Sequence, residues 1–549
     1  MQIPCTLLDT YVNLDNNSIT FQAMKTYAFK AIIFSLILVA CEKQSYDSRL
    51  DIGLPNHNAT THTSTVDISS ALMRPVQIGE KIPNPYSLDI MNEALNQLTT
   101  KSRAGIEKLE ATHHYIMFKP ECHAHYRSLI MQDDLDLNSF PLDHEISNGW
   151  ITTNPDPAFS TNGYSHKWSY IPIERDLTNI DCPYEILYDI FYIDEEDLNT
   201  KSDNISYELF EILESKAHSI CNIEQEAILQ TKATDITPYG NIKYYDSSYN
   251  ANLGCYGMSV KANRLTKTSY GHCDEDGNFK CDKSFKYKWT YTVYFGRTDF
   301  EIRKDTTSTE EVALVFTKQQ GPLNLLFDKS SEYVDHIFYC EILRAACKYY
   351  YGEIDGLNRP PYKEDLKDRI YIQAMRGHTP SGKTLGFFNY SSTLKSIPYI
   401  RIYRDDPDTH DRQPSSTIYF CTIHELAHSA HWKVNPSLFF NNCELKVKES
   451  FATGIGIHMT RKVHPSFNYG YGNTYTGVVE DLMDTDGVTS DSSHKYIENV
   501  SGLTIAEIEN SIAGVSTWSE WRDNIISLYP YNSSISNVTG LFSVWQNIF

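Results

Sequence analysis

The stretch His424-Glu425-Leu426-Ala427-His428 decides more about this chain than any other part of its 549 residues. The apolar run at 417–423 before it and the pair Asn435-Pro436 after it predict one helix, with Ser415 and Ser416 as expected N-caps. Positions four apart lie on the same helix face, one turn apart. The two histidines can therefore bind one metal ion, with Glu425 beside it to activate a water molecule.

Glu449 is the candidate for a further ligand. A catalytic zinc ion takes three protein ligands and keeps a fourth position open. Glu449 follows His428 by 21 residues and stands in the first turn of a second predicted helix, residues 449–458. The alternative interpretation is a buried amphipathic helix in which both histidines are simply hydrogen-bonded.

These residues resemble the gluzincin metallopeptidases, the thermolysin-like branch of the zincins. The resemblance covers roughly residues 320–549 and implies that His424, His428 and Glu449 bind one catalytic Zn²⁺, with Glu425 as general base. The string at 449–452, Glu-Ser-Phe-Ala, is also similar to the helix start of zinc aminopeptidases. More narrowly, the chain resembles Bacteroidetes lipoproteins that carry a predicted metallopeptidase domain.

The reaction inferred from these ligands is hydrolysis of a peptide bond. Zinc would polarise the scissile carbonyl and lower the pKa of its bound water toward about 7, while Glu425 takes that water's proton. The developing oxyanion needs one more donor. The downstream candidates for this donor are His458, His464, Tyr469, Tyr471 and Tyr475.

Two further residues near the motif have less direct roles. Asp481 could orient a ligand histidine as a neighbouring carboxylate, although a solvated helix face is the favoured alternative. His431 shares the face of His424 but lies seven residues beyond it, about 10 Å along the helix axis. We therefore expect His431 to be hydrogen-bonded, not to bind the metal.

Residues 1–41 predict an export signal. A short basic region begins at Met24, the expected true start, and a ten-residue apolar run at 31–40 is too short to span a bilayer. The run ends in Leu-Val-Ala-Cys41, which is typical of a bacterial lipoprotein signal whose cysteine is lipidated. Residues 42–65 are expected to form a flexible tether. The expected location is the cell envelope, with a lipid anchor in the outer membrane, facing the periplasm or the cell surface.

The remaining chain predicts a multidomain α+β protein. Residues 66–235 read as an α+β domain of unknown role, with a helix at 90–99. Residues 236–304 alternate short β-forming runs with turns, which is typical of a small antiparallel sandwich. They resemble the carboxypeptidase regulatory-like domain, a transthyretin-type sandwich, through Pro238-x-Gly240-x-Ile242, Gly257-x-x-Val260 and the turn at 274–279.

Residues 305–549 are expected to form the zincin-like α+β metallopeptidase domain. A helix at 333–351 and strands at 369–373 and 399–403 precede the metal helix, and helices at 504–512 and 518–528 follow it. One edge strand of a zincin sheet pairs with extended peptide substrate. The sequence leaves open which strand that is.

Charge and cysteine content limit the partners. The net charge is −22, and removing residues 1–41 takes away two basic and two acidic residues and leaves it unchanged. Such a surface repels nucleic acid. Cys340 and Cys347 lie two turns apart on a predicted helix, too far for a disulfide, whereas Cys273 and Cys281 could pair across a turn.

The sequence therefore predicts an envelope-anchored, monomeric zinc metallopeptidase that acts on a peptide or protein substrate. Two alternatives stay open. One is a zinc amidase acting on cell-wall peptides. The other is a non-catalytic surface-binding or adhesion lipoprotein with a degenerate peptidase domain, against which the intact Glu425 argues.

Overall fold

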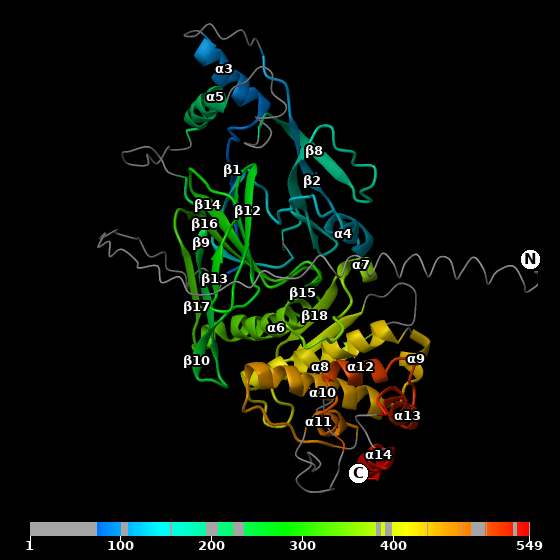
Figure 1. Ribbon diagram of the computed structural model, residues 1–549. Helices are drawn as coiled ribbons and strands as arrows, with labels where there is room; N and C mark the ends of the chain where they lie inside the picture. The colour runs from blue at the N-terminus through cyan, green and yellow to red at the C-terminus, as the bar shows by residue number, and fades with distance from the viewer. Residues whose placement is uncertain are drawn as a thin grey trace, which may run out of the picture. The chain divides into compact units, whose positions relative to one another are not determined.

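A four-stranded mixed sheet supports the C-terminal helices in the computed structural model (Figure 1). Its order is β15 (Phe300–Arg303), β18 (Ile370–Met375), β20 (Tyr399–Tyr403) and β19 (Gly386–Asn389). The first three strands run parallel, and β19 pairs antiparallel with β20 as the outermost strand of this order. The isoleucines of β18 and β20 are fully buried, because helices and the N-terminal residues cover both faces of parallel strands.

The structure describes residues 74–99, 108–153, 156–193, 207–222, 235–379, 386–389, 398–435, 437–472, 474–484, 500, 502–530 and 535–547. By its contacts the chain divides into two units, Met1–Thr65 and Val66–Phe549. The predicted signal, Cys41 and the predicted tether lie outside the described residues. No helix in the described ranges combines the length and apolar character needed to cross a bilayer.

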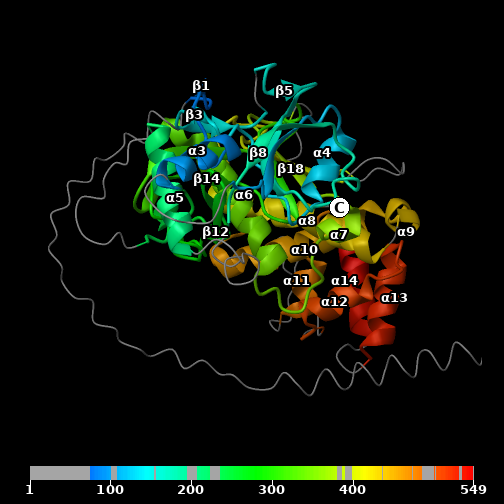
Figure 2. The ribbon, with the colours of Figure 1, turned by 90° about the horizontal axis from the view of Figure 1, so that it is seen from above.

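Three long helices pack beneath this sheet. They are α6 (Val334–Tyr351), α8 (Ser415–Val434) and α10 (Leu445–Val463). α6 contacts β15 and β18, α8 contacts α6, β19 and β20, and α10 packs along α8. In Figure 2 the later helices gather beside α10. Those helices are α11 (Val478–Met483), α12 (Ile505–Ser511), α13 (Trp518–Leu528) and α14 (Ile535–Asn547).

The ends of α8 and α10 differ partly from the prediction. α8 ends at its C-cap Asn435, as predicted, but begins at Ser415 with Pro414 as N-cap. Ser415 is the first residue of the helix, and its hydroxyl donates to Glu341, a buried carboxylate of α6. α10 begins at Leu445, so Glu449 stands in its second turn and not in the first.

Two further sheets form the middle of the molecule. One has the order β12-β11-β14-β16-β4, and in the other β9 pairs with β10, β13 and β17. Tyr291 of the first sheet packs edge-to-face on Phe279 of the second, with 5.9 Å between ring centroids. Their strands are β4 (Gly149–Ile151), β9 (Tyr239–Asp246), β10 (Ala251–Gly254), β11 (Ser259–Arg264), β12 (Lys267–His272), β13 (Asn278–Lys280), β14 (Trp289–Tyr294), β16 (Ala313–Gln319) and β17 (Leu323–Phe327).

The predicted boundaries at 235 and 304 do not coincide with the strand pairing. β4 lies before 235 but pairs with β16, and β16 and β17 lie after 304 but join the middle sheets. β15 lies before 304 but pairs with β18 of the C-terminal sheet. The middle-sheet strands within 236–304 pair antiparallel, as predicted, whereas β17, which lies beyond 304, adds to β9 in parallel. Pairing between distant segments leaves no local sequence signal, and the described part is a mixed α+β protein whose sheets share strands across these limits.

The N-terminal residues add a three-stranded sheet of order β7-β2-β8, with α3 and α5 packed on each other nearby. Tyr115 on the central strand is fully buried in the core of this region. The larger elements are α3 (Leu88–Thr99), β2 (His113–Phe118), α4 (His123–Ile130), β7 (Lys167–Pro172), β8 (Tyr184–Ile190) and α5 (Tyr207–Ile220). The short elements of the chain are β1 (Ile78–Lys81), β3 (His144–Ile146), β5 (Ser160–Thr161), β6 (Tyr164–Ser165), α7 (Lys363–Leu366) and α9 (Ser437–Asn442).

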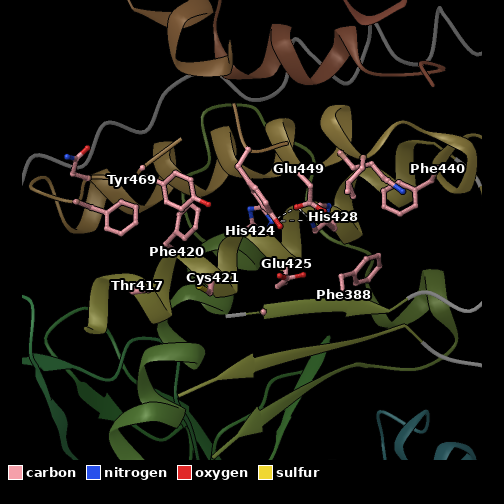
Figure 3. Close-up of a pocket in the computed structure, with 17 residues that line it drawn as sticks. Phe388, Thr417, Phe420, Cys421, His424, Glu425, His428, Phe440, Glu449 and Tyr469 are labelled. Atoms are coloured by element: carbon pink, nitrogen blue, oxygen red, sulfur yellow. Dashed lines mark hydrogen bonds and ion pairs between the residues drawn. The ribbon is translucent and has the colours of Figure 1, made fainter. Parts of the chain in front are cut away.

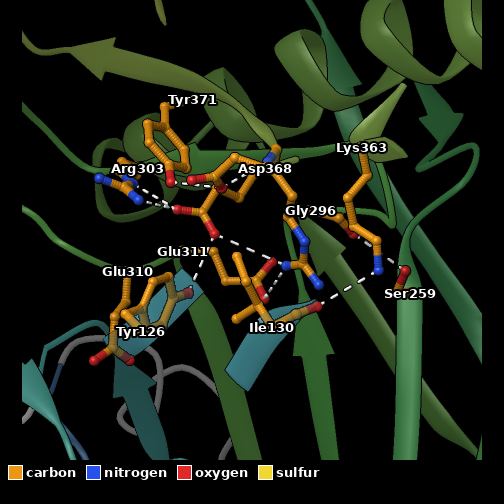
Figure 4. A network of polar contacts seen from close by, with 12 residues as sticks. Tyr126, Ile130, Ser259, Gly296, Arg303, Glu310, Glu311, Lys363, Asp368 and Tyr371 are labelled. Carbon is orange, nitrogen blue, oxygen red and sulfur yellow. Dashed lines mark hydrogen bonds and ion pairs between the residues drawn. The ribbon is translucent and has the colours of Figure 1, made fainter. Parts of the chain in front are cut away.

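A buried cluster of charged side chains joins α4, β15 and β18 (Figure 4). The Glu301 carboxylate is fully buried and accepts a hydrogen bond from Arg303 Nε at 2.5 Å and one from the Tyr126 hydroxyl at 3.3 Å. The Arg303 guanidinium lies 3.5 Å from the ring centroid of Tyr371. Burial raises the pKa of the neighbouring Glu311 to about 7. The hydrogen bond from Tyr126 on α4 attaches the N-terminal residues to the C-terminal sheet at this buried cluster.

The described cysteines are all free thiols. Cys273 and Cys281 are buried and do not form the disulfide that the sequence left possible.

Candidate metal centre

His424 and His428 lie one turn apart on α8, and Glu449 reaches them from α10 (Figure 3). α8 is buried along most of its length because α6 and α10 pack against it. Each of the two histidines is only 6% exposed. Burying polar side chains costs free energy unless they have hydrogen-bond partners or bind a metal, so the burial of these three side chains together calls for such a partner.

The three side chains converge on one point. His424 Nε2 lies 3.0 Å and His428 Nε2 lies 3.2 Å from the same oxygen, Glu449 Oε2, and the two nitrogens lie 3.2 Å apart. Ligand atoms bound at about 2.0–2.1 Å around a tetrahedral zinc ion are roughly 3.3 Å from each other. The triangle therefore fits one zinc ion. Within the described residues, no other group of three such side chains comes together in this way.

The electrostatics of the metal-free site favour a negative Glu449. Burial raises the pKa of this carboxyl, but the charge of His428 and hydrogen bonds from both imidazoles outweigh burial and hold the pKa well below its usual range. Burial lowers the pKa of His424. In His428 the nearby Glu449 outweighs the same burial effect and raises the pKa. An anionic oxygen beside two imidazole nitrogens is a donor set that a zinc ion accepts.

Glu425 lies against β19. Burial raises its pKa to about 8, and the backbone N–H of Phe388 partly offsets this shift. A Cβ atom at Gly386 would lie 2.5 Å from Glu425 Oε1, so only glycine leaves room for the carboxylate here. A nearby cation favours the ionised form of a carboxyl group. A bound metal would therefore make Glu425 a better proton acceptor.

A cavity of about 450 Å³ opens at these side chains. Figure 3 shows Phe420 and Tyr469 on the side of His424, and Phe388 and Phe440 on the side of His428. Phe420 stacks on Phe467 with 5.1 Å between ring centroids and lies 4.7 Å from Tyr469; we call these three residues the aromatic cluster. The wall near His428 is formed by Phe388, Phe440, Leu445 and Lys448.

Tyr475 is the best placed of the candidate oxyanion donors. It lines the cavity, and its ring centroid lies 6.0 Å from that of His424. Burial raises its pKa, and the charges of Glu449 and Glu425 add to the shift. Tyr469 also lines the cavity but packs on Phe420.

His458, one of the candidate oxyanion donors, lies elsewhere. Its Nε2 is 2.6 Å from Asp355 and it does not line the cavity. It follows Glu449 by nine residues on α10, which turns it half a helix circumference away from the metal ligands. His464 is also outside the cavity, 3.7 Å from Asp246 beyond the end of α10.

Tyr471 and Asp481 also lie outside the cavity. The Tyr471 hydroxyl donates to Glu480, and Asp481 accepts a hydrogen bond from Trp545 Nε1 at 2.6 Å. Asp481 therefore holds α11 to α14 and does not orient a ligand histidine. Among the described residues, the Nδ1 atoms of His424 and His428 have no hydrogen-bond partner.

His431 is hydrogen-bonded, in agreement with the sequence analysis. Its Nε2 lies 2.9 Å from Asn435 Nδ2, and its ring packs between Phe440 and Phe451. Burial lowers its pKa to about 3. It is a neutral core side chain near the end of α8.

The sequence could not identify β19 or single out Tyr475. β19 has four residues, and its place beside Glu425 arises only from pairing with β20. Comparison with protein-family models, with curated proteins and with solved structures finds no match to this chain.

Proposed function

We propose that this chain is a zinc-dependent metallopeptidase in which His424, His428 and Glu449 bind one Zn²⁺ ion. The observation that carries the proposal is the convergence of His424 Nε2, His428 Nε2 and Glu449 Oε2 within 3.2 Å of one another. The same cavity holds Glu425, a carboxylate that binds none of these atoms and is available for proton transfer.

The roles of the residues follow from their positions. A bound zinc ion would supply the Lewis acidity that polarises the carbonyl and activates the water. Glu425 accepts the proton of the attacking water and passes it to the leaving nitrogen. The Tyr475 hydroxyl donates to the carbonyl oxygen as negative charge builds there. β19, the outer strand of the sheet that lines the cavity, offers its backbone to an extended peptide that adds to the sheet.

The finer fold assignment belongs to the same proposal. A mixed sheet with an antiparallel outer strand, followed by two helices that share a metal site, supports a zincin-like domain in the C-terminal part. The paired middle sheets support a transthyretin-like sandwich, extended by β16 and β17. Attachment to the cell envelope through Cys41 remains a prediction from the sequence alone.

Zinc content tests the metal site. After loading and dialysis, we expect about one zinc ion per molecule in residues 42–549 and almost none in the Glu449→Ala variant, because two histidines alone hold the ion weakly. Glu353→Ala, which removes an exposed carboxylate outside the cavity, is the control and should bind zinc like the wild type. A wild-type protein that takes up no zinc would overturn the proposed function. Equal zinc in the Glu449→Ala variant would remove Glu449 from the ligand set.

Replacing Tyr475 by phenylalanine tests the oxyanion donor. We expect kcat to fall by about 10²-fold with zinc content unchanged, because one hydrogen bond to the developing charge is lost. Tyr469→Phe removes the hydroxyl of the other tyrosine that lines the cavity and should change kcat much less. A larger loss in Tyr469→Phe than in Tyr475→Phe would assign the donor to Tyr469.

A further inference from the structure

Lys448 is the one lysine or arginine that lines the cavity among the described residues. It precedes Glu449 on α10, and neighbouring positions on a helix point about 100° apart. Glu449 therefore reaches the histidines while Lys448 lies on the wall beside them. Its Nζ lies 5.3 Å from the ring centroid of Phe440, and this contact holds the ammonium group at the cavity edge.

Lys448 forms no ion pair with another residue of the described part of the chain, whereas Lys433 and Lys462 both pair with carboxylates. The cavity floor carries Glu425 and Glu449, and the whole chain has a net charge of −22. Apart from the proposed metal position, Lys448 is the one cationic side chain of this lining that can pair with an anionic substrate group, so it favours one place for such a group.

The rest of the cavity wall is apolar at both ends. Beside Lys448 lie Phe388, Phe440 and Leu445, and Leu445 is 55% exposed at the rim. At the other end, past His424, the aromatic cluster offers three rings, of which Phe467 stacks on Phe420 and Tyr469 is tilted against it. Exposed and half-buried apolar side chains around a polar centre are typical of a site that binds apolar groups of a ligand.

We propose that the cavity takes peptides that place a carboxylate against Lys448 and a large apolar side chain against the aromatic cluster. The inference rests on the proposed peptidase function and adds the class of substrate to it. The carboxylate can come from an aspartate or glutamate side chain or from the free C-terminus of the peptide, since both offer the same anionic group to the ammonium.

Peptide binding to zinc-loaded Glu425→Gln protein tests this directly, because hydrolysis is blocked. The probes are fluorescent peptides of fixed length with phenylalanine-rich sequences, in which one glutamate or one glutamine is moved through each position. Each peptide is made as the free acid and as the C-terminal amide. We expect glutamate at one position, or the free acid, to bind about fivefold to tenfold more tightly than its neutral partner.

Variants of Lys448 decide whether this residue causes the preference. Lys448→Gln should remove the preference for the carboxylate, and Lys448→Glu should reverse it toward a lysine-containing peptide. Lys462→Gln is the matched control, because Lys462 stands on the same helix but pairs with Asp355 outside the cavity. Added salt should weaken the preference in the wild-type background.

The outcomes separate this inference from the proposed function. A lysine-dependent preference without hydrolysis of the same peptides by wild-type protein supports the inference and counts against a peptidase. Hydrolysis by the wild type without any carboxylate preference keeps the peptidase and overturns the inference. The inference is also overturned if no peptide binds, or if the preference persists in Lys448→Gln.

Discussion

Replacing Glu425 by glutamine is expected to lower the rate of peptide hydrolysis by about 10³-fold while the protein keeps its zinc. Glutamine has nearly the same shape as glutamate, so it fits in the same space against Gly386. That space is narrow, because a Cβ atom added at Gly386 would lie 2.5 Å from Glu425 Oε1. It cannot accept the proton of the attacking water. The measurement is kcat under saturating peptide, together with zinc per molecule in the same samples.

The outcomes for Glu425→Gln are read from kcat and zinc content together. Retained zinc with lost activity assigns proton transfer to Glu425 and leaves the ligand set untouched. A variant that keeps more than about a tenth of wild-type kcat contradicts the role, because loss of a general base costs at least about 10²-fold. Loss of zinc in Glu425→Gln would instead mean that this carboxylate supports the metal site.

Replacing Arg303 by methionine is expected to lower the free energy of unfolding by about 3–5 kcal/mol. The change leaves Glu301, which is fully buried, without the guanidinium that donates to it at 2.5 Å. Arg369 Nη1 lies 3.8 Å from Glu301 and gives only a weaker, longer contact. The measurement is urea unfolding followed by tryptophan fluorescence.

The double variant Glu301→Leu with Arg303→Met is the control. Removing both charges eliminates the unpaired carboxylate, so the double variant should regain most of the stability lost by Arg303→Met. A single variant that costs less than about 1 kcal/mol would show that water or Arg369 compensates for the missing guanidinium. A double variant no more stable than the single one would assign the loss to packing of Arg303 on Tyr371.

Helices were predictable from the sequence where their signals are local. The helix Trp518–Leu528 and the strand Tyr399–Tyr403 have the predicted bounds, and α8 ends at the predicted Asn435. Periodicity, caps and breaking residues act over one or two turns and can be read along the chain. The spacing of four between His424 and His428 belongs to the same class of signal.

What the sequence could not give depends on contacts between distant segments. The partner of each strand, the position of β19 beside Glu425 and the choice of Tyr475 over Tyr471 all follow from folding of separated parts. Tyr471 and Tyr475 are four residues apart and chemically alike. They differ in their surroundings: the Tyr471 hydroxyl donates a hydrogen bond to Glu480, whereas Tyr475 lines the cavity.

The two faces of β16 pack into two different hydrophobic cores. Ala313 and Val315 pack into the N-terminal core, while Leu314 and Phe316 pack into the larger core that includes the metal helix. β4 adds to the outer edge of β16. Some secreted hydrolases are switched on when a protease cuts away a leading segment. Here such a cut would remove β4 and leave the backbone of β16 unpaired along that edge, so we expect the residues that carry β4 to stay with the folded molecule.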